Sequence, residues 1–174
     1  MYSGDFITSE SGLHPELKFL KECMFDKGGH VFADLRVNAE SEEYSACTFA
    51  LDGRIVHYRV SKNTPTKTGQ FVTIWQRNDL GITEPYNASD KFDFIMIVSL
   101  AERLRGLFIF PKLVLVEKGI VTANGKMGKR GIRVYPPWDV PGSRQGEMTQ
   151  RWQTKYFIHL DDAVHPGVIK QMLR

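Results

Sequence analysis

Apolar residues recur along the chain at two different spacings, one typical of helices and one typical of strands. Near the start, Leu17, Leu20 and Met24 lie at helical spacing after a proline, and a pair of glycines follows as a stop. This pattern predicts an N-terminal helix of roughly three turns.

Residues 44–51 and 54–61 instead alternate between apolar and polar side chains, on either side of Asp52-Gly53. Such a dipeptide between alternating segments is typical of a tight two-residue β-hairpin, so the sequence predicts two antiparallel strands. The turn also predicts the register on one face. The expected pairs are Leu51 with Arg54, Phe49 with Val56, Cys47 with Tyr58, Ser45 with Val60, and Glu43 with Lys62.

Four further segments predict strands. Residues 70–77 follow a loop at 63–69 and alternate as a third strand, rich in β-branched and aromatic residues. Residues 92–100 predict a buried strand that turns helical at its end. Strands are also expected at 107–116, which a proline interrupts, and at 131–135.

The C-terminal third predicts helices. Met148, Trp152 and Tyr156 lie at helical spacing, and residues 164–173 read as a short closing helix. The expected fold class is therefore α/β of the α+β kind: an N-terminal helix, then a three-stranded antiparallel meander in a mixed central sheet flanked by helices.

Composition bears on the number of domains and on the cellular location of the protein. The 174 residues are 42% hydrophobic and 25% charged, and they contain no repeat or linker, so we expect one domain spanning 1–174. Residues 1–11 do not resemble a secretory signal, and no apolar stretch reaches the roughly 20 residues of a membrane span. These features predict a cytoplasmic protein that does not insert into membranes. The two cysteines, Cys23 and Cys47, lack metal-ligand spacing and suggest reduced core residues.

Glu43 and Lys62 are the clearest candidates for catalytic residues. The predicted register places them opposite each other at the open end of an otherwise apolar face. A carboxylate and an ammonium in that position suit a divalent metal or a scissile phosphate. The alternative is a plain cross-strand ion pair, which contributes about 0.2–1 kcal/mol.

Two loops offer donors for an anion. Lys67 is surrounded by threonines and followed by a glycine, but the segment lacks the P-loop pattern. A second loop, at 125–131, is basic and leads into a segment with aromatic residues, which suits phosphate contact combined with base stacking. The net charge of +3 permits a phosphate-bearing partner without requiring one.

Several of these segments together resemble a known family. The matching residues are Glu43-Tyr44, Tyr58-Arg59-Val60, Lys62, Thr64-Pro65, Lys67, Gly69-Gln70-Phe71-Val72-Thr73, Trp75, Arg77, Phe108, Phe110-Pro111, Gly128-Lys129-Arg130, Arg133, Tyr135-Pro136, Trp138, Thr149-Gln150, Trp152-Gln153 and Tyr156-Phe157. The pattern resembles the MepB family, which is named for a gene beside a bacterial multidrug efflux transporter. The resemblance implies a bacterial cytoplasmic protein with a restriction-endonuclease-like α/β fold.

Active nucleases of that fold hold Mg²⁺ or Mn²⁺ with two carboxylates and keep a lysine beside the attacking water. In this chain Lys62 matches the lysine, but the carboxylate expected two residues earlier is missing. Only a relocated carboxylate, Glu43 or Asp52, would complete a metal site. Under this reading Glu43 binds the metal, Lys62 orients water, and Lys67 or Arg77 steadies the phosphate.

The leading hypothesis is a nuclease-like domain that binds nucleic acid or another phosphate-bearing ligand on one face. The residues expected there are Glu43, Lys62, Lys67, Gln70, Trp75, Arg77, Lys129, Arg130, Arg133 and Tyr135. A second hypothesis is a small-molecule-binding accessory protein linked to drug or stress response, with Trp75, Tyr135 and Trp138 as an apolar wall. A third is a protein-interaction module with an exposed apolar patch.

Overall fold

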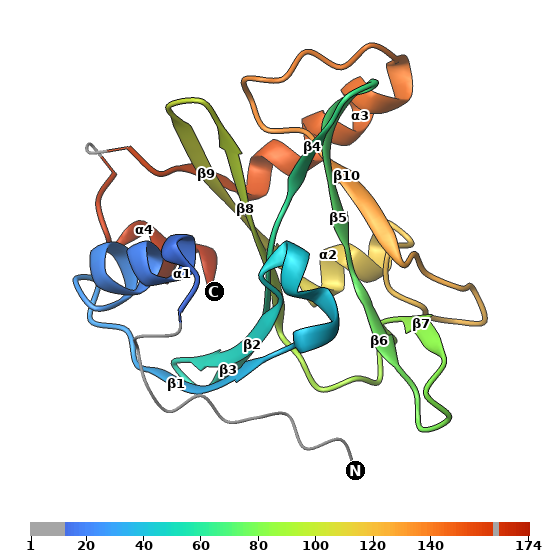
Figure 1. Cartoon of the computed structure of the whole chain (residues 1–174), viewed down its shortest axis with the longest axis horizontal. Coiled ribbons are helices and arrows are strands. Elements are labelled where there is room, and N and C mark those ends of the chain that lie inside the picture. The colour runs from blue at the N-terminus through green and yellow to red at the C-terminus, as the bar shows by residue number, and fades with distance from the viewer. Residues whose placement is uncertain (1–12, 162–163) are drawn as a thin grey trace.

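A six-stranded mixed sheet lies at the centre of the computed structural model, which describes residues 13–161 and 164–174 (Figure 1). Its strands run in the order β1-β2-β3-β8-β9-β11, and only β3 and β8 are parallel neighbours. The strands are β1 (Phe32–Val37), β2 (Cys47–Leu51), β3 (Arg54–Val60), β8 (Phe94–Ala101), β9 (Leu104–Pro111) and β11 (Phe157–His159).

The predicted hairpin is confirmed between β2 and β3. Leu51 pairs with Arg54, and the ladder continues through Phe49–Val56 to Cys47–Tyr58. Asp52 and Gly53 have φ angles of 50° and 77°, as a tight turn with two left-handed residues requires. The two outer pairs do not form, because the ladder ends at Cys47. The chain before it is a 3₁₀ helix, η3 (Ala39–Tyr44), followed by Ser45 in a left-handed conformation.

Helices cover one face of the central sheet. The predicted N-terminal helix is confirmed as α1 (Pro15–Leu20), which continues as a π-helical segment η2 (Lys21–Phe25). The closing helix α4 (Val168–Met172) packs beside it and begins later than the sequence suggests (Figure 1). Residues 1–12, where the sequence lacks a signal pattern, lie outside the described part of the chain.

A second layer covers the opposite face. It contains a three-stranded sheet in the order β10-β5-β4, formed by β10 (Gly131–Val134), β5 (Lys67–Thr73) and β4 (Lys62–Thr64). Helix α2 (Lys112–Glu117) and a small ribbon of β6 (Trp75–Arg77) and β7 (Thr83–Pro85) complete it.

The third predicted strand therefore belongs to another sheet. Residues 70–77 divide between β5 and β6, and β5 pairs with β10 rather than with the hairpin. The meander is completed instead by β1, a strand that the sequence did not predict. Asp34 in β1 has a φ of 55°, and the register shifts there, which breaks the alternation that marks a strand.

Two predicted segments differ from the expectation in where a strand gives way to a helix. Residues 92–100 do not turn helical, because β8 continues to Ala101 and reverses through Glu102 into β9. The strand expected at 107–116 ends at Pro111, whose fixed φ suits the start of α2. The strand at 131–135 is confirmed as β10. No helix in the described ranges is both long and apolar enough to cross a membrane.

The face of β3 toward the second layer carries two basic side chains. Arg59 is only 2% exposed and donates hydrogen bonds to the Tyr58 carbonyl at 2.8 Å and the Tyr86 hydroxyl at 3.0 Å. His57 stacks on Tyr86 with ring centroids 4.5 Å apart, and its Nδ1 lies 3.0 Å from the Thr48 hydroxyl. Burial, with the nearby Arg59 charge, lowers the pKa of His57 to about 3.

The lowered pKa of His57 predicts a pH-dependent stability. In the unfolded chain this histidine takes up a proton near pH 6.5, whereas in the folded chain it stays neutral until about pH 3. The stability that the buried neutral ring contributes is therefore fully present above pH 6.5 and is lost as the pH falls toward 3. In His57→Phe the free energy of unfolding should therefore fall less steeply between pH 6.5 and 4, as measured by urea titration. The exposed His159, changed to Gln, serves as the control and should leave the slope unchanged.

Gly106 in β9 gives a packing test. A Cβ at this position would overlap the ring of Phe157, which lies between Phe108 and Trp138. Gly106→Ala should destabilise the fold by roughly 1–3 kcal/mol, measured by thermal and urea unfolding. Gly142→Ala is the matched control, because no atom lies within 4 Å of the place that its Cβ would occupy. Equal stability of the two variants would contradict this packing.

Candidate anion-binding cleft

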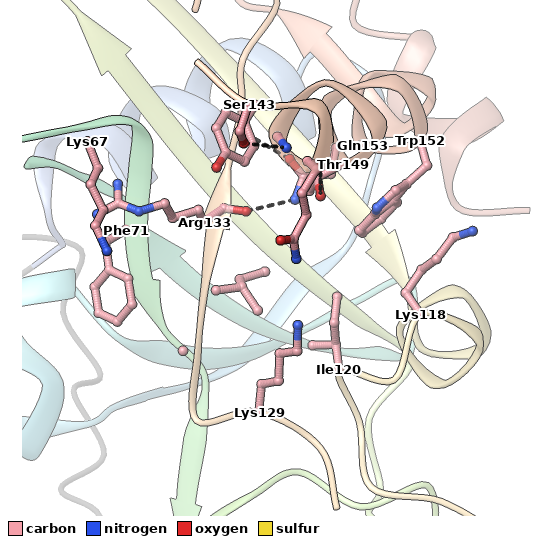
Figure 2. Close-up of a pocket in the computed structure, with 15 residues that line it drawn as sticks. Lys67, Phe71, Lys118, Ile120, Lys129, Arg133, Ser143, Thr149, Trp152 and Gln153 are labelled. Carbon is pink, nitrogen blue, oxygen red and sulfur yellow. Dashed lines mark hydrogen bonds between the residues drawn. The ribbon is translucent and has the colours of Figure 1, made fainter. Parts of the chain in front are cut away.

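A cleft of about 550 Å³ opens where β10, β5 and the helix α3 (Arg144–Gln153) meet (Figure 2). Strand residues form one wall, the helix forms another, and the segment after α2 forms the floor. The lining residues are Lys67, Phe71, Lys118, Ile120, Lys129, Gly131, Ile132, Arg133, Tyr135, Ser143, Gln145, Gly146, Thr149, Trp152 and Gln153.

The small sheet sets which side chains face the cleft. Phe71 in β5 pairs with Arg133 in β10 on one side and with Lys62 in β4 on the other, so the three side chains form one row on one face. Gly69 has a φ of 81°, and a Cβ there would lie 2.7 Å from the Tyr135 ring. Glycine is therefore required for the Tyr135 ring to approach this strand so closely.

Gln153 joins α3 to the free edge of β10. Its Oε1 accepts a hydrogen bond from the Tyr135 backbone N–H at 2.8 Å, and its Nε2 donates to the Arg133 carbonyl at 2.9 Å. The side chain is 1% exposed and takes the place of a neighbouring strand. At the other end of α3, the Ser143 hydroxyl accepts from the Gly146 N–H and caps the helix.

Four cations line the cleft, and no aspartate or glutamate is among the described residues that line it. The Arg133 guanidinium donates to the Thr64 hydroxyl at 2.8 Å and the Gly69 carbonyl at 3.2 Å, which holds the loop that carries Lys67. Within the described residues, Lys118 forms an ion pair with its neighbour Glu117, at 3.5 Å. The cleft is therefore positively charged and able to attract an anion.

Comparison with known proteins identifies the family. A family model described as MepB-like matches residues 38–159, which include α3 and every strand of the structure except β1. The chain belongs to the MepB-like family. A solved structure described as the crystal structure of MepB is 34% identical, with a TM-score of 0.74, covering 86% of this chain and 99% of that one. A search of curated proteins found no match. The mixed α/β fold of this MepB-like chain is thus similar to that of MepB.

Four of the residues predicted from the sequence meet in the cleft of the MepB-like chain. They are Lys67, Lys129, Arg133 and Tyr135. Gln70 does not reach it, because its side chain is fully buried. Its Oε1 accepts from the Ser61 hydroxyl at 2.7 Å and its Nε2 donates to the Leu100 carbonyl at 3.0 Å, so it joins the two sheets.

Glu43 and Lys62 do lie side by side, although η3 rather than the hairpin ladder brings them together. The Lys62 Nζ is 2.9 Å from Glu43 Oε2, with side chains 42% and 66% exposed. Lys62 also lies over the Tyr44 ring. Among the described residues, no three histidine, cysteine or acidic side chains gather as metal ligands. The roles of Glu43 at a metal and of Lys62 beside water stay predictions.

The remaining predicted residues lie away from the cleft lining. Arg77 forms an ion pair with Glu40 at 2.5 Å and lies over the Trp75 ring, and Arg130 is exposed in its loop. Trp138 packs against Phe157 and His159. One face shared by all the predicted residues stays a prediction, and of the expected apolar wall of Trp75, Tyr135 and Trp138 only Tyr135 lines the cleft.

Sequence reasoning missed the contribution of the segment after α2 and of α3. Lys118, Thr149 and Gln153 line the cleft, and Trp152 both packs against Phe110 and lines the cleft. A glutamine and a threonine beside a tryptophan on an amphipathic helix were the available signal. This signal did not identify the role of Gln153, because the hydrogen bond from its side chain to β10 forms only when the chain is folded.

Gln153 provides a test of this architecture. Gln153→Met would leave the Tyr135 N–H and the Arg133 carbonyl without a partner, at a cost of about 1–3 kcal/mol for each buried group. We expect a clear loss of unfolding free energy in urea. Gln145→Met, an exposed change on the same helix, should be nearly neutral. Equal effects of the two changes would contradict the edge-pairing role.

Proposed function

We propose that the cleft binds the phosphate of a nucleotide or nucleic acid. The observation that carries the proposal is the gathering of Lys67, Lys118, Lys129 and Arg133 around one hollow whose described lining contains no carboxylate. Like charges held together repel one another, and a bound phosphate relieves that repulsion.

The shape and chemistry of the walls support a nucleotide unit. A volume of about 550 Å³ falls within the range of small-ligand sites. Phe71, Tyr135 and Trp152 offer ring surface on which a base can stack. Ser143 and Thr149 add hydroxyl groups as donors to phosphate or sugar.

The proposal concerns binding, and nuclease chemistry would extend it. Lys62 lies in the same cross-strand row as Arg133, one strand beyond Phe71, so the Glu43–Lys62 pair borders the side of the small sheet that faces the ligand. Incubation of nucleic acid with the protein and Mg²⁺ or Mn²⁺, against a chelator control, tests this extension. Metal-dependent cleavage that Glu43→Gln abolishes would support a restriction-endonuclease-like activity.

The second candidate is a small-molecule accessory protein linked to drug or stress response. The ring surfaces of Tyr135 and Trp152 in the cleft favour it, since aromatic walls also bind uncharged compounds. The four cations favour an anionic ligand instead. A neutral aromatic compound that raises the melting temperature, with no effect from nucleotides, would favour this second function.

Removing two of the cations tests the main proposal. Lys67→Ala combined with Lys129→Ala should weaken binding of a labelled single-stranded 12-mer by roughly a hundredfold or more, because charge-assisted contacts contribute about 1.5–3 kcal/mol each. Fluorescence anisotropy over a range of salt concentrations measures the affinity. The salt dependence should also fall, by about 0.7 in slope for each lost phosphate contact.

The matched control is Lys27→Ala combined with Lys91→Ala. Both lysines are exposed and lie outside the cleft, so the net charge changes equally. The control should bind like the wild type. Equal weakening in both double variants would assign binding to overall charge and refute the cleft.

A further inference from the structure

A second hollow lies on the outer side of α3, with a volume of about 620 Å³. Four residues line this groove and not the cleft: Arg144, Met148, Arg151 and Lys155. None of them belongs to the site predicted from the sequence. Like the cleft, the groove has no aspartate or glutamate among the described residues that line it.

The cleft and the groove are continuous. They share Lys118, Gln145, Thr149 and Trp152 as lining residues, so each hollow ends where the other begins. Trp152 packs against Phe110 with ring centroids 5.3 Å apart, and Lys118 Nζ lies 5.8 Å from the centre of the Trp152 ring. Figure 2 shows these two side chains together at one side of the cleft. Trp152 therefore stands at the junction, with its ring anchored in the core.

Helical spacing gives the groove its length. Arg144, Arg151 and Lys155 fall on one side of α3 and of the turn that follows it, with Met148 between them, 59% exposed. Eleven residues of helix span roughly 16 Å, which is several times the rise along the axis for each phosphate of one duplex strand, about 3.4 Å. The acidic residue of this helix, Glu147, does not line the groove and lies beside a different hollow, which Arg151 also lines.

We propose that the cleft and the groove form one track for a single-stranded nucleic acid, whose backbone crosses α3 beside Trp152. This inference rests on the proposed function and names its substrate class. Seven cations follow the two hollows, which is more than the phosphates of one nucleotide need. A base that stacks on Trp152 must be unpaired, which favours a single strand over a duplex.

Ligand length separates this inference from the proposed function. The test uses a groove variant, Arg144→Gln combined with Lys155→Gln, and two labelled probes, a trinucleotide and a 12-mer of single-stranded oligothymidylate. The ratio of wild-type to variant affinity is compared for each probe, which cancels the larger number of binding registers on the longer strand. We expect a loss of about tenfold for the 12-mer and no loss for the trinucleotide, which binds through the cations of the cleft.

Other outcomes of this comparison would refute the track, the cleft proposal or the single-stranded substrate. An unchanged affinity for the 12-mer, or an equal loss for both probes, would refute the track and leave the cleft proposal standing. If neither probe binds the wild type, both the cleft proposal and the track are refuted. A 12-base-pair duplex that competes as well as the 12-mer strand would refute the single-stranded substrate.

Tryptophan fluorescence adds a second readout, in case the groove variant folds poorly. Binding of the 12-mer should quench the wild type, and Trp152→Phe, which retains a ring against Phe110, should remove most of that quenching. Trp138→Phe is the control, because its ring packs against Phe157 outside both hollows. Quenching that persists in Trp152→Phe would contradict stacking at the junction.

Discussion

Burial of both faces of the central strands is the constraint on which the rest of the structure depends. In β8 the side chains of Phe94, Met96 and Val98 enter one core, while Ile95 and Ile97 enter the other. A strand that is apolar on both sides must be covered on both sides. One cover is helical, and the other is the layer that contains the small sheet and α2.

The cleft exists because the small sheet is part of the second layer. A three-stranded sheet has two outer edges, and the unpaired backbone groups along the edge formed by β10 need partners. Gln153 supplies two of them and thereby fixes α3 against the sheet. Strand and helix side chains then meet at an angle instead of packing flat. The hollow between them is therefore a consequence of how an exposed sheet edge is satisfied.

Local features were predictable from the sequence, and long-range ones were not. The Asp52-Gly53 turn determines the register of its hairpin because only a few residues are involved. The partner of β5 is β10, some sixty residues later, and no periodicity within β5 reveals it. The same reason explains why the sequence predicted only part of the cleft lining. Lys67, Lys129 and Arg133 stood out as basic loop and strand residues, whereas Gln153 and Lys118 acquire their roles only through tertiary contacts.

The distribution of ion pairs explains why the predicted cations have different roles. Lys62 and Arg77 have carboxylate partners, Glu43 and Glu40, supplied by the acidic segment that folds into η3. Arg133 instead meets hydroxyl and carbonyl groups, which orient the guanidinium without neutralising it. A net charge of only +3 thus conceals a strongly uneven surface. The acidic side chains neutralise cations elsewhere, and the positive potential concentrates where α3 meets β10.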